Sequence, residues 1–198
     1  MALVEFDSIA VGMVTGDAMV KASPLGSIYA GTVHPGKYLV LVSGDTASVE
    51  EALDVGIDTG GAAVIATVFL PDIHPLVTAA IVGADPGGAP DGDALGIVET
   101  ASVAAIIDAA DAGVKAARVG LPAVRLADGL GGKGYALFSG DVADVEAALE
   151  AAVDRAQPSG SVLQHRIIPQ LHEEMAANLA ADLRFSRRAA RRDVERGG

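Results

Sequence analysis

The chain of 198 residues has no cysteine, no tryptophan, and only four phenylalanines and three tyrosines. Without thiols it forms no disulfide, uses no cysteine nucleophile, and holds no zinc or iron–sulfur cluster through cysteine. Because 51% of its residues are nevertheless hydrophobic, Ala, Val, Leu and Ile must fill its core. A mean hydropathy of +0.40 excludes a disordered chain, and the length suits one large domain or two of about 100 residues.

Positive charge is also scarce. Only 14 Lys and Arg residues oppose 26 Asp and Glu residues, for a net charge of −12. General nucleic-acid binding is therefore not expected, because phosphate contacts need basic side chains. Residues 182–198 hold six Arg and three acidic residues, a net of +3, which leaves −15 on residues 1–181. We expect this basic tail to be solvated or to rest on the acidic body, and an arm for nucleic acid or membrane is the alternative.

Two kinds of hydrophobic segment are missing. The N-terminal MALVEFDS has no basic region followed by an apolar stretch, so no signal peptide is expected. No run of about 18 apolar residues is present, so no membrane-spanning helix and no membrane partner are expected.

The two halves of the chain repeat each other. Three blocks recur in the same order at offsets of 94, 96 and 98 residues: 4–22 with 98–116, 43–53 with 139–149, and 70–74 with 168–172. Between the copies, GADPGGAPDGD at 83–93 has the composition of a linker. We therefore predict a first domain at 1–82, the linker at 83–93, a second domain at 94–172 and a tail at 173–198, helical or partly disordered.

Each copy has the same order of predicted elements. In the second copy, Val103, Ile106, Ile107, Ala110 and Val114 fall on one face of a helix. The predicted strands are 2–6, 25–31, 37–43 and 62–70, and then 94–99, 121–127, 134–139 and 161–168. The predicted first helices are 8–22 and 101–117, and a second helix follows Asp45 and Asp141, which suit an N-cap.

This order is β-α-β-β-α-β, twice, which predicts an α+β fold of two tandem ferredoxin-like domains, each an antiparallel sheet with two helices on one face. The helices are rich in alanine, and Gly12 and Gly16 lie in the first. Small residues leave little apolar bulk in a half of this size. We expect each half to gain stability by packing against its sibling or another subunit.

The sequence motifs that could indicate a catalytic, nucleotide-binding or metal-binding site are weak. GLGGKG at 129–134 matches the spacing of a dinucleotide fingerprint, but a strand is predicted after it where that site needs a helix, so a hairpin turn is favoured. The four histidines, at 34, 74, 165 and 172, have no metal-site spacing within one chain. His34 differs from the others because it lies in a hairpin loop beside Pro35, where symmetry could gather copies, although a solvated loop histidine is the default expectation. We predict no catalytic, cofactor-binding or metal-binding residue within the chain.

Several spaced motifs carry a family resemblance. In the second copy these are the strand ALGIVET, a helix ending DAGVKA, the loop GLGGKG and the GDV that opens the second helix. The first copy matches more loosely, with VEFD, DAMVKA and SGDT. Together, over about residues 2–172, they resemble the shell-protein domain of bacterial microcompartments. The tandem arrangement resembles the class in which three chains form a six-domain pseudohexagonal tile.

The resemblance implies two sets of site residues. The hairpin loops would line a central pore, through Val33, His34, Pro35, Gly36, Leu130, Gly131 and Gly132. The tile edge would carry Lys21, Lys115, His74 and His172. The family's usual Pro-Arg-Pro-His at the last strand reads PDIH and PQLH here, so the edge arginine is absent from both copies.

We therefore expect a structural shell protein and not an enzyme. It would form a homotrimer with an open pore for small metabolites, meet neighbouring shell proteins and possible encapsulated enzymes, and need no cofactor. The resemblance places it in the microcompartment shell, in the bacterial cytoplasm. The alternative from the residues is a regulatory protein that binds a small molecule between tandem ferredoxin-like domains. A regulator should carry its unusual polar residues at a strand–helix loop, whereas here they lie in the hairpin loop.

Overall fold

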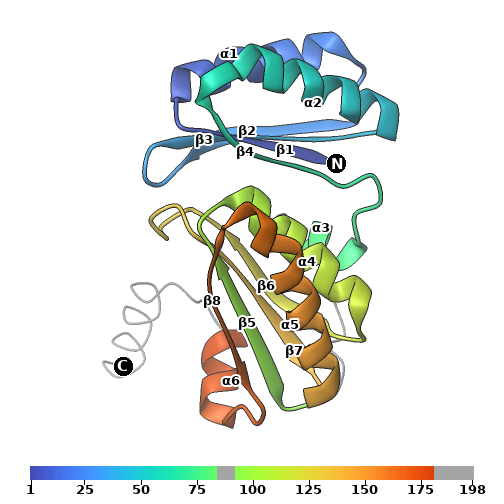
Figure 1. The fold of residues 1–198 in the computed structure, drawn as a ribbon, viewed down its shortest axis with the longest axis vertical. Helices are drawn as coiled ribbons and strands as arrows, with labels where there is room; N and C mark the ends of the chain where they lie inside the picture. Colours follow the sequence, from blue (N-terminus) through green and yellow to red (C-terminus); the bar gives the residue numbers. More distant parts are fainter. Residues whose placement is uncertain (84–91, 181–198) are drawn as a thin grey trace, which may run out of the picture.

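The computed structural model describes residues 1–83 and 92–180 and has two halves of the same topology (Figure 1). The first half comprises β1 (Ala2–Phe6), α1 (Ile9–Ala22), β2 (Ser27–Val33), β3 (Lys37–Ser43), α2 (Thr46–Gly60), β4 (Val64–Phe69) and α3 (Pro75–Ile81). The second comprises β5 (Ala94–Thr100), α4 (Val103–Ala116), β6 (Gly120–Leu126), β7 (Gly134–Gly140), α5 (Val142–Ala156), β8 (Val162–Ile168) and α6 (Glu173–Ala180).

The sheets confirm the predicted fold. Their strand orders are β2-β3-β1-β4 and β6-β7-β5-β8, with antiparallel pairing throughout. The register is duplicated as well, because Leu3 pairs with Leu41 in the first sheet and Ile97 with Leu137 in the second. Both first strands also shift register near their ends against the last strand of their sheet. Counterpart residues in the two halves can therefore be compared directly.

The ends of the helices follow the local sequence. Ser8 and Ser102 cap α1 and α4 by accepting from backbone N–H groups at 3.4 and 3.1 Å. Asp45 accepts from the backbone N–H and the hydroxyl of Ser48, which holds the pKa of its carboxyl below the ordinary value. Asp141 occupies the same position before α5 but makes no capping hydrogen bond with its side chain.

GLGGKG forms the turn between β6 and β7, and a strand, not a helix, follows Gly134. This confirms the predicted hairpin and removes the structural context that a dinucleotide fingerprint needs. Of the proposed linker, residues 84–91 lie outside the described part of the chain, as do residues 181–198 of the proposed tail. Among the helices that the structure describes, none has the length and apolar character needed to cross a bilayer.

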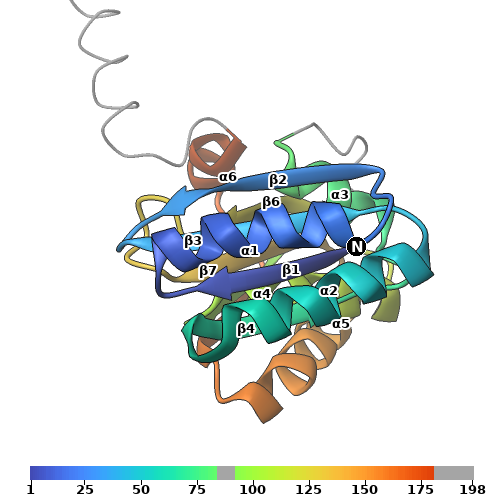
Figure 2. The same cartoon turned by 90° about the horizontal axis from the view of Figure 1, so that it is seen from above.

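The two halves of the chain pack against each other. In the first half, α1 and α2 cover the outer face of the sheet, and the opposite face looks toward the second half (Figures 1 and 2). Leu3, Val68, Leu70 and Val77 of the first half belong to the same buried apolar cluster as α4. One face of the first sheet is thus covered by a helix from the second half, as the modest bulk of each half led us to expect.

Candidate functional site

A buried carboxylate joins the two halves at the N-terminus of α4. The side chain of Glu5, on β1, is fully buried, and one of its oxygens accepts from Lys37 Nζ at 2.6 Å. Its other oxygen accepts from the backbone N–H of Val103, the first residue of α4, at 2.9 Å. A negative charge is favourable there because the first amides of a helix have no partner within the helix.

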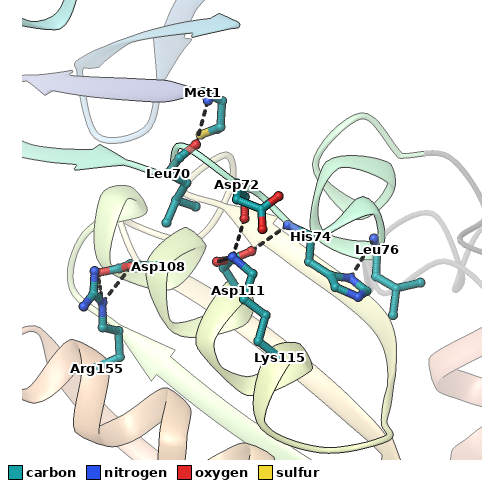
Figure 3. Close-up of polar contacts among 9 residues, drawn as sticks. All are labelled: Met1, Leu70, Asp72, His74, Leu76, Asp108, Asp111, Lys115 and Arg155. Atoms are coloured by element: carbon teal, nitrogen blue, oxygen red, sulfur yellow. Dashed lines mark hydrogen bonds and ion pairs between the residues drawn. The ribbon is translucent and has the colours of Figure 1, made fainter. Parts of the chain in front are cut away.

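A second polar cluster joins the halves at the other end of α4 (Figure 3). The backbone N–H of His74 donates to Asp111 Oδ1 at 2.7 Å. Lys115 Nζ donates to Asp111 Oδ2 at 2.6 Å and also to the carbonyl oxygen of Asp72. The segment that follows β4 is therefore tied to α4 by residues from both halves.

His74 and His172, both predicted at the tile edge, each stand at the start of a helix. His74 Nδ1 accepts from the backbone N–H of Leu76 at 3.2 Å, at the beginning of α3. His172 Nδ1 accepts from the backbone N–H of Glu174 at 3.2 Å, at the beginning of α6. Both imidazoles thus have a local capping role that the sequence pattern did not indicate.

The apolar face of α4 is buried, whereas its counterpart on α1 is exposed. Val103, Ile107 and Val114 are at most 7% exposed. Their counterparts at the offset of 94 residues are exposed to 37% at Ile9, 54% at Met13 and 40% at Val20. The two helices carry similar residues. Each packs on the sheet of its own half, and the difference in burial arises because only α4 also has the sheet of the other half against this second face.

The polar residues of the junction show the same contrast. Glu5 is the counterpart of Glu99, whose side chain is 40% exposed and lies 3.6 Å from Lys133 Nζ. The side chain of Asp111 is 6% exposed, and that of its counterpart Asp17 is 61% exposed. Lys21, the counterpart of Lys115, is 71% exposed and pairs with Asp17. The chain thus contains one closed junction and exposes a second copy of both of its surfaces.

The two predicted pore loops lie together, at the same end of the molecule in Figures 1 and 2. His34 Nδ1, from the β2–β3 loop, lies 3.2 Å from Asp128 Oδ1, from the β6–β7 loop. A Cβ atom at Gly132 would lie 3.1 Å from Pro35 Cδ, so the loops touch. Asp128 was not among the predicted site residues, although it stands directly before the glycine-rich turn in the sequence.

A lysine near the end of each loop pairs with a glutamate. Lys37 pairs with Glu5, and Lys133 pairs with Glu99. Near the loops, a groove of about 840 Å³ runs over the face of β2 and β3, lined by side chains such as Tyr29, Leu39, Leu41 and Ile81. Within the described ranges, no group of three or more His, Asp or Glu side chains is placed to hold a metal ion.

The known proteins that resemble this chain agree with one another in family. A family profile described as "BMC domain" matches residues 1–73 and again 94–171. The bacterial microcompartment shell protein PduT of Citrobacter freundii is 40% identical over 173 residues, which cover 87% of this chain and 93% of PduT. The shell protein EutM of Salmonella typhimurium is 41% identical over 83 residues, which cover 42% of this chain and 84% of EutM.

A solved structure agrees with these relatives. The crystal structure of a microcompartment protein from Desulfitobacterium hafniense DCB has a TM-score of 0.78 and 39% identity, and the match covers 89% of this chain and 97% of that one. These relatives are shell or microcompartment proteins, and none of their names supports the regulatory alternative.

Proposed function

Because the chain belongs to the BMC-domain family and is a structural shell protein of bacterial microcompartments, we propose that three copies close into a six-domain tile with a central pore. Proteins of this family form hexamer-like tiles with other shell proteins. The observation that carries the proposal is the second, exposed copy of the junction surfaces.

The open surfaces predict which contacts a neighbouring chain makes. Repeating the closed junction would bring α1 of one chain onto the exposed face of the β5–β8 sheet of the next. Glu99 would then accept from the backbone N–H of Ile9, as Glu5 accepts from that of Val103. By the same correspondence, Asp17 would accept from the backbone N–H of His172.

Such a contact is head-to-tail, because it joins two different surfaces. Head-to-tail contacts form a closed ring when the rotation between units divides a full turn evenly, and an open filament when it does not. Six domains related by equal steps close after three chains. The hexamer-like tiles of the family favour the closed outcome.

The contact between the hairpin loops supports the position of the pore. In a ring of six equivalent units, two neighbouring equivalent atoms are as far from each other as each of them is from the axis of the ring. Loops that touch their counterparts would therefore lie close to the axis, and the loops carrying Pro35 and Gly132 touch. The pore would be lined by Val33, His34, Pro35, Gly36, Leu130, Gly131 and Gly132, and we add Asp128. Backbone amides of glycines and polar side chains suit small polar metabolites.

The same geometry supports the proposed tile edge. Helix α4 has 14 residues and is about 20 Å long, with Val103 at the end near the pore loops and Lys115 at the other. Lys115 and its counterpart Lys21 would thus lie at the rim, beside His74 and His172, where neighbouring shell proteins would meet. We propose no bond chemistry for the chain, and encapsulated enzymes are possible partners on one face.

The test of the trimer compares two substitutions on one helix. Met13→Asp would place a charge in the proposed contact, and we expect it to leave the chain folded but monomeric. Val14→Asp is the matched control. Val14 is more exposed, at 64%, but its counterpart Asp108 is paired with Arg155, which belongs to the second half itself.

Light scattering would measure the mass, with a trimer of 19.8 kDa chains expected for the wild type and Val14→Asp. Electron microscopy at high concentration should then show layers with a hexagonal repeat. A wild-type protein that stays monomeric, or a Met13→Asp variant that stays trimeric, would contradict the proposed interface.

A further inference from the structure

The four histidines differ in which ring nitrogen is free. His74 and His172 accept backbone N–H groups at Nδ1, so in the neutral ring the proton is on Nε2 and no lone pair remains there. His34 Nδ1 faces the carboxylate of Asp128 at 3.2 Å. An ionised carboxylate only accepts hydrogen bonds, so Nδ1 of His34 carries the proton and Nε2 keeps its lone pair.

This is the arrangement that metal-binding histidines use. A carboxylate on one ring nitrogen fixes the tautomer, orients the ring and makes the other nitrogen a better ligand. His165, the remaining histidine, is an exposed residue of β8, which is not one of the strands that flank the two loops. Within residues 1–83 and 92–180, His34 is the one histidine whose ring is held by an acidic side chain, and that side chain comes from the other half of the molecule.

The two loops hold this pair in place. The His34–Pro35 turn is closed by a hydrogen bond from the Gly36 N–H to the Val33 carbonyl at 3.0 Å. The loop of Asp128 is closed by a bond from the Ala127 N–H to the Lys133 carbonyl at 3.0 Å. The side chains of His34 and Asp128 are 72% and 69% exposed, so the ring is both positioned and accessible.

One chain supplies one such imidazole, and symmetry would supply the other two. From the contact between the loops we inferred above that they lie close to the three-fold axis of the proposed tile. We propose that the three His34 imidazoles bind one divalent transition-metal ion on that axis, through Nε2, with Asp128 of each chain as the orienting carboxylate. This inference rests on the trimer described under the proposed function.

Zinc is the ion that fits this donor set most directly. Three neutral imidazoles with a fourth position open to water are a common zinc arrangement, and cobalt, nickel and copper ions also bind imidazole. The open position would face the pore. A passing anion or carbonyl oxygen would meet a cation at the narrowest part of the tile, in a chain whose net charge is otherwise −12.

The experiment measures metal content and oligomeric state on the same samples. Untagged full-length protein is loaded with Zn²⁺, or with Co²⁺ for its visible absorption, and freed of excess ion. Native mass spectrometry reports the number of chains and ions in each particle. We expect one ion for every three chains, and none in His34→Ala, which should remain trimeric.

Two further variants separate the proposed site from surface binding. Asp128→Asn should weaken Zn²⁺ binding about 10–100-fold and keep the same stoichiometry, because it removes the orienting carboxylate and no ligand. His165→Ala should bind Zn²⁺ as the wild type does.

The outcomes distinguish the two proposals. A wild-type trimer that binds no ion, or binds one that His34→Ala retains, overturns the metal site and leaves the tile intact. A wild-type chain that is not trimeric overturns both, and the mass shows this independently of the metal content.

Discussion

At the start of α2, one carboxylate links helix stability to pH. Asp45 accepts two hydrogen bonds from Ser48, and these lower its pKa from the ordinary value of 3.8. A lowered pKa in the folded state means that the ionised form stabilises the fold above pH 3.8, and that this contribution is lost as the pH falls through the lowered pKa.

We therefore expect Asp45→Ala to lower the urea midpoint at pH 7, and the difference from wild type to shrink as the pH falls below about 4. Asp141→Ala is the matched control, since Asp141 stands at the same position before α5 without a capping bond. Equal losses from the two substitutions at pH 7 would contradict a role for the side-chain cap.

Substitution of Glu5 should have a large effect on the free energy of unfolding. It is fully buried, and Glu5→Gln would leave the Lys37 charge without its partner at the junction. Removing one member of a buried ion pair costs about 3–5 kcal/mol, so we expect a loss of about 3 kcal/mol in the free energy of unfolding.

Glu99→Gln is the control, because Glu99 is the exposed counterpart of Glu5. In a single chain this substitution should cost less than about 1 kcal/mol, as for an exposed ion pair. It should, however, weaken assembly if Glu99 meets the next chain. Chemical denaturation and light scattering measure the two effects separately, and a large loss in chain stability from Glu99→Gln would be inconsistent with this assignment.

At the scale of elements, close packing of α1 on its sheet depends on one glycine and not on another. A Cβ atom at Gly12 would lie 2.6 Å from Tyr38 Cδ1 and 2.8 Å from Tyr38 Cβ. At Gly16 the nearest atom would be Val40 Cγ2 at 3.4 Å, an ordinary contact. Gly12 is therefore required by the approach of the helix, and Gly16 is not.

We expect Gly12→Ala to destabilise the protein by about 1–3 kcal/mol through overpacking. Gly16→Ala should be neutral or stabilise it by about 0.5–1 kcal/mol, because alanine is the better helix former. Thermal and urea unfolding of the two variants measure this. Opposite signs are the expected result, and a stabilised Gly12→Ala would mean that α1 lies farther from β3.

At the scale of the whole molecule, the closed junction within the chain differs in polarity from the exposed second copy of its surfaces. Ala66 and Val68 on β4 correspond to Gln164 and Arg166 on β8 at the offset of 98 residues. Val68 is buried against the second half, whereas Arg166 is exposed. The contact within a chain is thus more apolar than the proposed contact between chains.

We therefore expect the trimer to dissociate on dilution, or in mild denaturant, before the chain unfolds. Light scattering should fall while the circular dichroism of the helices stays constant. A single transition in which mass and secondary structure are lost together would show that the chain has no stability apart from the trimer.

The sequence by itself determined the local features of the protein. The repeat, the order of strands and helices in both halves, the cap at Asp45 and the hairpin at GLGGKG all follow from hydrophobic periodicity and turn chemistry. The family followed from motifs short enough to read along the chain. These features depend on residues near one another, which is why they could be predicted.

Only the tertiary structure decided which copy of each surface is covered. Ile9 and Val103 occupy the same place in nearly the same pattern, yet one is exposed and the other is buried. The contacts of Glu5 with Val103 and of His34 with Asp128 join residues 98 and 94 positions apart. No periodicity encodes such pairs, because they arise from how one folded half packs against the other.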